Sequence, residues 1–205
     1  MRQISLRSPS TPLAEGRFEM ELWTGRGLYD AVIRDGILCA KRSVWIATAN
    51  VKELYVERPG LRRGVGSIVA AFDELAGRGV ELRLLHADLP SRPFRAAFDR
   101  RARLVAGALQ RRHCPRVHLK TVIVDGSRLY LGSANLTGAG LGIRGDDKRN
   151  FELGFVTEDF ELLDRVQALY QELWDGAPCS TCQLRAICPD PGPKRLAANS
   201  SRTKR

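Results

Sequence analysis

The sequence predicts one α/β domain, in which helices cover both faces of a mixed β-sheet. Apolar segments of strand length alternate with amphipathic segments of helix length through the middle of the chain. An Asp-Gly pair between two runs of β-branched and aromatic residues predicts an antiparallel hairpin, and an earlier strand–helix–strand order predicts a parallel pair. The chain has 205 residues, of which 43% are hydrophobic, so it is long enough to bury one core.

The expected elements can be placed in order along the chain. The first half is expected to form a helix, a strand, a second helix and a second strand, at residues 27–42, 43–49, 65–76 and 80–85. The first of these strands is apolar enough to be buried on both faces, as strands inside α/β sheets are. The second half adds a helix, the hairpin, a glycine-rich loop, a strand and a helix, at residues 94–105, 122–131, 138–142, 151–156 and 159–174.

The hairpin brings four polar residues into register with one another. If its loop has two residues, the residue numbers of each pair across the hairpin add up to an odd number. Directly paired residues share a face, so His118, Lys120, Ser133 and Asn135 would then lie on one face. A three-residue loop would break this parity. One His and one Lys on a strand are ordinarily surface residues, so the shared face is the observation that favours a functional site.

These four side chains suit a phosphoryl group. Lys120 offers a compact positive charge, and Ser133 and Asn135 offer a hydroxyl and an amide donor for phosphate oxygens. His118 can act as a nucleophile or as a general acid and base near neutral pH. The pattern therefore predicts phosphoryl chemistry at the hairpin.

The same stretch resembles a known family. The full signature of the phospholipase D (PLD) superfamily is similar to the pattern His118-x-Lys120-x4-Asp125-x6-Gly132-Ser133-x-Asn135. With one such motif, the chain is similar to the bacterial endonuclease-type members of that superfamily. The resemblance extends from about residue 23 to residue 175, and it implies a PLD-like α-β-α sandwich with one domain per chain.

The resemblance also implies how the reaction proceeds. Two such motifs are needed, because one His attacks phosphorus to form a phosphohistidine and the other protonates the leaving oxygen. His86 and His113 lack a Lys two residues later, so neither begins a second motif. The second His must then come from another subunit, which implies a homodimer that shares one active site and needs no catalytic metal.

Two further motif residues receive roles. By resemblance, Glu152 holds the catalytic imidazole through its other nitrogen; the alternative is an ordinary exposed Glu on a strand. Asp125 lies at the hairpin turn, where an Asp is expected from turn chemistry alone, so we expect it to act structurally within the motif.

Positive charge is concentrated near this motif. The net charge is +10, and residues 92–116 contain eight arginines with one acid, while residues 194–205 contain five basic residues with none. Such clustering favours a polyanion, for which we expect nucleic acid, with DNA favoured. An anionic membrane surface and a merely solvated helix face are the alternatives. The expected nucleic-acid-binding residues are Arg100, Arg101, Arg103, Arg111, Arg112 and Arg116.

The cysteines form a second group. Cys179-x2-Cys182-x5-Cys188-Pro189 resembles the iron–sulfur staple of RecB-type nucleases, in which three late cysteines join a distant upstream one. Cys114 is the expected fourth ligand, and His113 could replace it for zinc. The spacing does not separate a structural 4Fe-4S cluster from zinc, and free thiols are the remaining alternative. Cys39, in an apolar helix, is expected in the core.

The chain organisation follows from these assignments. Residues 1–15 are expected to be a poorly ordered N-terminus, 16–176 the catalytic domain, 177–190 a cysteine-rich metal or cluster loop, and 191–205 a disordered basic tail. No run approaches the roughly 18 apolar residues of a membrane span, and the first residues lack the apolar core of a secretory signal. We therefore expect a cytoplasmic protein without a transmembrane segment.

The favoured function is a homodimeric nuclease that hydrolyses nucleic-acid phosphodiester bonds through a phosphohistidine, without a catalytic metal. The alternatives are a PLD-type lipid phosphodiesterase or phosphatidyl transferase, and a DNA-binding subunit that keeps the fold without catalysis.

Overall fold

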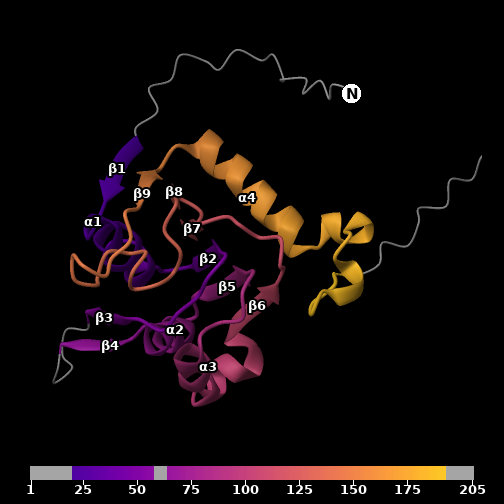
Figure 1. The fold of residues 1–205 in the computed structure, drawn as a ribbon, viewed down its shortest axis with the longest axis horizontal. Coiled ribbons are helices and arrows are strands. Elements are labelled where there is room, and N and C mark those ends of the chain that lie inside the picture. The colour runs from indigo at the N-terminus through magenta and orange to yellow at the C-terminus, as the bar shows by residue number, and fades with distance from the viewer. Residues whose placement is uncertain (1–19, 58–63, 193–205) are drawn as a thin grey trace, which may run out of the picture.

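The computed structural model describes residues 20–57 and 64–192 (Figure 1). The expectations for residues 1–15, and for the tail beyond residue 192, lie outside the described residues. Within them, the chain forms a mixed seven-stranded sheet with helices on both faces, so the predicted fold class is confirmed.

The sheet combines antiparallel and parallel pairs. Its strand order is β1-β9-β8-β7-β2-β5-β6. Strands β2, β5 and β6 are parallel to one another, and the remaining neighbours are antiparallel. The strands are β1 (Met20–Thr24), β2 (Ser43–Thr48), β5 (Glu81–His86), β6 (Leu109–His113), β7 (Thr121–Val124), β8 (Arg128–Gly132) and β9 (Leu153–Thr157). A separate two-stranded sheet pairs β3 (Tyr55–Glu57) with β4 (Val65–Ser67).

Helices cover the two faces of the sheet unequally. One face carries α1 (Gly27–Tyr29) with the π-helical turn Asp30–Arg34 that continues it, α2 (Ile68–Gly77) and α3 (Arg92–Asp99). The other face carries α4 (Phe160–Trp174), which begins after an N-cap at Asp159, whose carboxylate accepts from the Leu162 N–H at 2.8 Å. The remaining short helical turns are Ile37–Cys39, Leu104–Ala108, Ala177–Thr181 and Arg185–Ile187.

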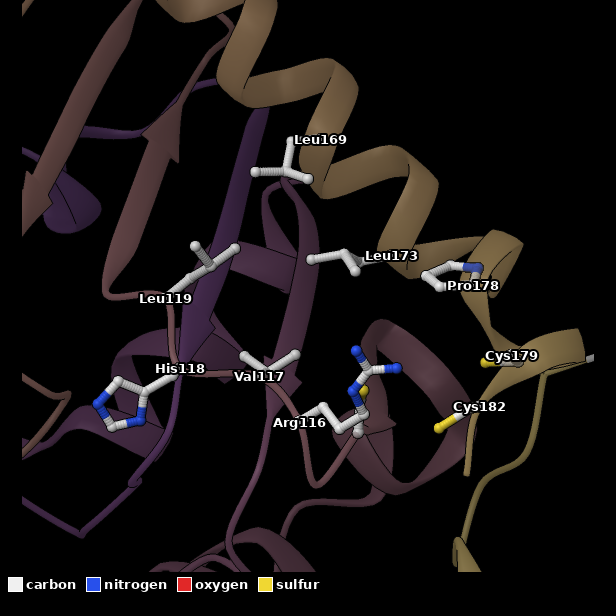
Figure 2. A pocket seen from close by; sticks show the side chains of 10 residues that line it. Arg116, Val117, His118, Leu119, Leu169, Leu173, Pro178, Cys179 and Cys182 are labelled. Carbon is white, nitrogen blue, oxygen red and sulfur yellow. The ribbon is translucent and has the colours of Figure 1, made fainter. Parts of the chain in front are cut away.

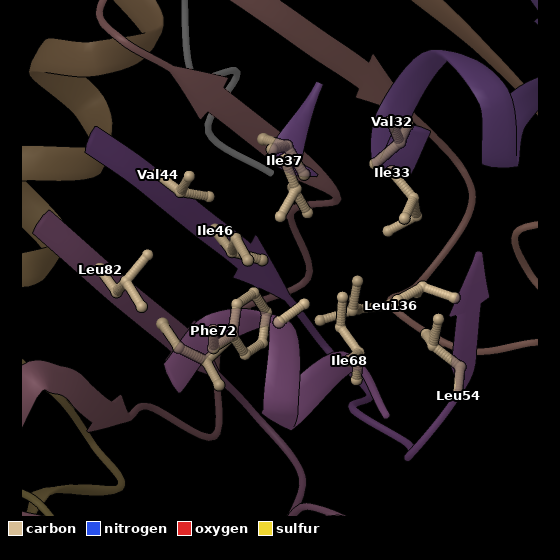
Figure 3. Packing of buried hydrophobic residues seen from close by; sticks show 14 of the residues in the cluster. Val32, Ile33, Ile37, Val44, Ile46, Leu54, Ile68, Phe72, Leu82 and Leu136 are labelled. Atoms are coloured by element: carbon tan, nitrogen blue, oxygen red, sulfur yellow. The ribbon is translucent and has the colours of Figure 1, made fainter. Parts of the chain in front are cut away.

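The two faces have separate hydrophobic clusters because side chains alternate along each strand. On β2, Val44 and Ile46 pack with Phe72 of α2 in the larger cluster (Figure 3). Ala47 packs on the opposite face with Tyr170 of α4. Strand β2, in the interior of the sheet, is therefore buried on both faces, as its continuous apolar sequence predicts.

Several elements differ from the sequence expectations. The helix expected at 27–42 is interrupted at Gly36, where a Cβ would lie 2.5 Å from a carbonyl oxygen of the preceding turn. The helix expected from 65 begins at Ile68, because Val65–Ser67 pairs as β4. The helix expected to reach 105 ends at Asp99. Strands β1, β3 and β6 were not predicted. Cys39, expected in the core, is exposed, and its thiol donates to the Arg34 carbonyl at 3.2 Å.

The hairpin register also differs from both registers considered for a two-residue loop. Val124 pairs with Arg128, so the loop contains three residues, 125–127, and partners sum to an even number. Asp125 and Gly126 both adopt positive φ, 55° and 63°, which lets the chain reverse within this loop. The parity that placed His118, Lys120, Ser133 and Asn135 on one sheet face is therefore wrong.

Strand β8 ends where two glycines face each other. Gly132 of β8 pairs with Gly154 of β9 beneath the side chain of Tyr130. A Cβ on Gly154 would overlap the Tyr130 ring, and one on Gly132 would lie 2.6 Å from the Leu153 carbonyl oxygen. Glycine at these positions lets the two backbones approach closely, which sets the position of Ser133 directly beyond.

Candidate active site

The motif residues gather at one end of the sheet, although they lie outside its strands. His118 and Lys120 immediately precede β7, and Ser133 and Asn135 follow β8. Because β7 and β8 are antiparallel, the start of one lies beside the end of the other, as the backbone N–H of Gly132 donating to the Lys120 carbonyl at 3.1 Å shows. Glu152 precedes β9 at the same end.

Ser133 and Glu152 form the best-defined pair of the site. The Ser133 hydroxyl donates to the Glu152 carboxylate, and its oxygen accepts from the Leu153 backbone N–H at 3.2 Å. The other Glu152 oxygen accepts from the Asn150 amide at 3.0 Å. In the described part of the chain, the carboxylate is thus held by Ser133 and Asn150, and no hydrogen bond joins it to His118.

Lys120 lies close to this pair. Its ammonium donates to the backbone carbonyl of His118 at 2.9 Å. Partial burial lowers the pKa of Lys120, and the nearby negative charge of Glu152 opposes that effect without cancelling it. A cation, a hydroxyl and a carboxylate therefore lie together, with the cation restrained by the chain that carries His118.

Asn135 is oriented by the end of β2. Its amide oxygen accepts from the Thr48 hydroxyl and from the Asn50 backbone N–H, both at 3.1 Å. The Thr48 hydroxyl also accepts from the Leu136 N–H at 3.2 Å, which ties the chain after β8 to the end of β2. Because its oxygen is occupied, Asn135 presents its –NH₂ group as the donor for a ligand.

The imidazole of His118 is exposed. Figure 2 shows the ring directed away from the neighbouring cavity, whose wall includes Val117 and Leu119. Among the residues that the structure describes, no protein group hydrogen-bonds either ring nitrogen. The single chain thus leaves this imidazole open to a ligand or to a second subunit.

A cavity of about 650 Å³ opens beside Ser133 and Glu152. Its wall also includes Arg149 and Asn150, residues that the sequence did not indicate. Arg149 pairs with Asp146 at 3.2 Å and adds a second positive charge next to the pair. Asn150 could have been suggested by its spacing of two residues from Glu152. Thr48 carried no such signal, because it orients Asn135 from a distant part of the sequence.

Comparison with known proteins identifies the family. The sequence profile described as "Cardiolipin synthase, PLD-like domain" matches residues 33–174. The chain belongs to the PLD-like family. The PLD-like domain places it in the phospholipase D superfamily of phosphodiesterases. No curated protein matches the sequence.

Solved structures share the PLD-like fold. Nuc from Salmonella typhimurium, a phospholipase D family member, is 20% identical, with a TM-score of 0.54 over 76% of this chain and 95% of that one. NucT from Helicobacter pylori is 19% identical, with a TM-score of 0.53 over 77% and 96%. Polyphosphate kinase from Porphyromonas gingivalis is 16% identical, with a TM-score of 0.54 over 77% of this chain and 26% of that one. At these identities, the similarity establishes the fold alone.

The remaining motif residue, Asp125, lies at the opposite end of the sheet of the PLD-like domain. Its carboxylate accepts from the backbone N–H groups of Lys41, Arg42 and Ser43, at 3.0, 2.7 and 2.9 Å. Partial burial raises the pKa of this carboxyl, but the three hydrogen bonds outweigh it and hold the pKa below its ordinary value. Asp125 therefore fastens the hairpin turn to the start of β2.

Replacing Asp125 with alanine is expected to lower the free energy of unfolding by about 1–3 kcal/mol at neutral pH, because three backbone donors lose their acceptor. The folded-state pKa is depressed, so this contribution is complete above the ordinary value of 3.8 and is lost as pH falls through the folded-state pKa. Urea unfolding at several pH values measures the difference between variant and wild type.

The matched control is Asp147→Ala, which removes an exposed carboxylate paired with Lys148 at 3.6 Å and should change stability by less than about 1 kcal/mol. A difference for Asp125→Ala that stays constant well below the ordinary carboxyl pKa would show that the charge of Asp125 does not stabilise the turn.

The arginines expected to bind nucleic acid are dispersed. Arg103 pairs with Asp73 at 3.2 Å, and Arg111 stacks 3.9 Å from the centroid of the Phe98 ring. Arg112 is largely buried and donates to the Trp174 carbonyl. Arg101 is partly buried, whereas Arg100 and Arg116 are exposed. Arg116 and His118 both line one cavity, but Val117 lies between them and the Arg116 side chain bonds to Cys182 (Figure 2). The structure thus turns Arg116 toward the cysteines and gives Arg112 a packing role.

The four cysteines expected to bind metal lie together. Cys114, Cys179, Cys182 and Cys188 all line one small cavity at the end of α4, and the last three lie beyond the residues that the family profile matches. Their thiols are free in the structure. Within residues 20–57 and 64–192, no three His, Cys, Asp or Glu side chains are already arranged as metal ligands. The His113 ring, considered for zinc, stacks on His86 with centroids 5.0 Å apart.

Proposed function

We propose that this PLD-like chain is a homodimeric nuclease, in which two copies of His118 act on one phosphodiester of a nucleic acid. The observation that carries the proposal is the gathering of Lys120, Ser133, Asn135 and Glu152 around the end of the hairpin, beside an exposed imidazole. The resemblance of the single motif to endonuclease-type members supports the choice of nucleic acid over lipid.

The proposed reaction has two displacements. The imidazole of one His118 attacks phosphorus and forms a P–N bond, while the leaving oxygen takes a proton from the other His118. That second imidazole then accepts a proton from water, whose oxygen attacks phosphorus and breaks the P–N bond. Lys120 and the amide of Asn135 donate to the non-bridging oxygens, where negative charge develops. Protons and charges balance without a catalytic metal.

Glu152 has two tasks in this proposal. Its carboxylate holds the Ser133 hydroxyl by accepting the hydroxyl proton. Because the Leu153 N–H occupies one lone pair of the Ser133 oxygen, one lone pair remains to face the substrate. A carboxylate has about four acceptor positions, and Ser133 and Asn150 use two of them. The remaining positions are available to a ring N–H of His118 in the assembled dimer, which keeps the expected orienting role within the proposal.

An exposed apolar surface supports the dimer. Leu22 of β1 pairs with Phe155 of β9, and Met20 and Leu153 extend the same face, since residues that pair across antiparallel strands share a face. All four are exposed, Leu22 by 59%. This surface, which we call the β1–β9 patch, adjoins the site, because Leu153 bonds to Ser133. A second copy that covers the patch would complete a site that one chain leaves incomplete.

Two findings bear on a lipid substrate. The family profile is described as a cardiolipin synthase PLD-like domain, which makes a phospholipid the second candidate. None of the helices in the described residues has the length and apolar composition needed to cross a bilayer. The net charge of +10 suits either polyanion, so the substrate is decided by direct assay.

The test is a substrate panel with the full chain in excess EDTA. The panel contains supercoiled plasmid, single-stranded DNA, RNA, and vesicles of phosphatidylglycerol or phosphatidylcholine. We expect nucleic-acid cleavage that EDTA does not abolish, and no lipid turnover. Lipid headgroup release without nucleic-acid cleavage would replace the proposal with a lipid phosphodiesterase. Salt-sensitive DNA binding without any turnover would make the chain a binding subunit.

A further inference from the structure

The C-terminal segment, residues 177–192, is folded with little apolar burial. It contains two 3₁₀ turns, Ala177–Thr181 and Arg185–Ile187, in which no residue is buried. Of its two large aliphatic side chains, Ile187 is 78% exposed, and Leu184, on the wall of the cysteine-lined cavity, is 36% exposed. Ordering a residue costs about 1–2 kcal/mol of backbone entropy, which apolar burial normally offsets. This segment therefore needs another source of stability.

Polar contacts fix the segment against the domain. Arg185 donates to the carbonyls of Cys179 and Gly192, both at 3.1 Å, and the Asp190 carboxylate accepts from the His113 backbone N–H at 3.2 Å. Such bonds contribute only about 1 kcal/mol each when exchanged with water. These hydrogen bonds orient the segment, so that its cysteines face the end of β6, where Cys114 lies.

All four thiols line the same small cavity. Cys179 belongs to the first 3₁₀ turn and Cys182 follows it, with its backbone N–H donating to the Cys179 carbonyl at 3.4 Å. Cys188 follows the second turn, and Cys114 comes from the end of β6. In Figure 2, Cys179 and Cys182 project from the segment toward Arg116. Two 3₁₀ turns and the end of β6 thus bring four cysteines to one cavity.

Glycines make room for this arrangement. A Cβ on Gly176 would lie 3.3 Å from the Cys179 sulfur, and one on Gly192 would lie 3.1 Å from it. Gly176 also has a φ of 71°, a left-handed conformation that glycine adopts without strain. The backbone is therefore shaped closely around the Cys179 thiol.

We propose that Cys114, Cys179, Cys182 and Cys188 bind one zinc ion that fastens the C-terminal segment to the PLD-like domain. Four thiolates are a preferred ligand set for structural zinc, and the Cys179–Cys182 spacing is one that zinc sites use. Within the described residues no three of these side chains stand in ligand geometry, so binding of the ion must reorient the thiols.

The charge of the cavity wall suits a metal that is held by four thiolates. Four thiolates and one Zn²⁺ carry a net charge of about −2, and the cavity wall supplies three arginines to balance it, Arg112, Arg116 and Arg185.

The test is metal analysis of the purified full chain, with no substrate present, so its outcome is independent of the proposed nuclease activity. We expect about one zinc per chain after dialysis. Cys179→Ser and Cys114→Ser should lose most of that zinc. Cys39→Ser is the matched control and should keep it, because Cys39 is exposed in another part of the chain, where its thiol donates to the Arg34 carbonyl.

Two measurements on the wild-type chain keep the test decisive if the variants fail to fold. Exchange of zinc for Co²⁺ should give the visible spectrum of a tetrahedral thiolate site. Removal of the metal by a chelator should expose the segment to trypsin at Arg185. Iron with acid-labile sulfide would overturn the single-ion site in favour of a cluster. A metal-free chain whose cysteines are all freely titrated, or are disulfide-bonded, would overturn metal binding altogether.

Discussion

His118→Ala is expected to reduce the rate of phosphodiester hydrolysis by at least about 10³-fold, with little change in stability. The reason is that the variant removes the only proposed nucleophile of the chain, whose exposed ring makes no packing contribution to the core. The phosphohistidine intermediate should disappear as well. Initial rates on the preferred substrate in EDTA, together with acid-labile phosphorylation of the quenched enzyme, measure both effects.

Lys120→Ala should also reduce the rate strongly, because it removes the cation beside Ser133 and Glu152. The matched control is Lys41→Ala. The Lys41 side chain is exposed, and its backbone N–H bonds to Asp125 at the other end of the sheet, so activity should be unchanged. If the purified His118→Ala variant kept more than about a tenth of wild-type activity, nucleophilic attack by this imidazole would be ruled out.

Mixing wild-type and His118→Ala subunits is expected to reduce activity more than in proportion to the variant. If one site needs both imidazoles, only wild-type pairs are active, and activity falls as the square of the wild-type fraction. With equal amounts mixed at random, about one quarter of the rate remains, whereas independent subunits would keep about one half. Two affinity tags confirm that the heterodimer forms.

The β1–β9 patch provides an independent check on the shared site. Leu22→Arg places a charge in the middle of the exposed apolar face without changing the motif. It should convert the protein to a monomer, as measured by light scattering, and abolish activity although His118 is intact. A fully active Leu22→Arg monomer would contradict the shared site, and a proportional loss in the mixing experiment would do so as well.

The central elements could be predicted because their sequences have strong local signals. Strand β2 is continuously apolar, β5 follows a clear helix, and α4 has an N-cap and regular apolar spacing. Strand β6 could not be predicted, since Leu109 is its only apolar residue and its pairing with β5 is a tertiary contact. The order of the elements predicts the parallel pair β2 and β5, but it does not predict the edge strands β1 and β6.

The residue types of the site could be predicted from the sequence, but part of its geometry could not. The chain at Lys120 lies beside the chain at Ser133, because the Gly132 backbone N–H donates to the Lys120 carbonyl, although the argument from strand parity is wrong. That argument failed because the third loop residue, Ser127, cannot be counted from sequence, and one extra residue reverses every face. The contact of Asn135 with Thr48 spans 87 positions, and no local pattern records such a distance.

The position of β6 at the end of the sheet has a consequence for solubility. An unpaired strand edge can recruit the same edge of another molecule and start aggregation. Here Arg111 and Arg112 place positive charge on that strand, and the Asp190 carboxylate occupies the His113 backbone N–H. The C-terminal segment therefore shields the edge, so truncation after α4 should leave a folded chain that precipitates at concentrations the full chain tolerates.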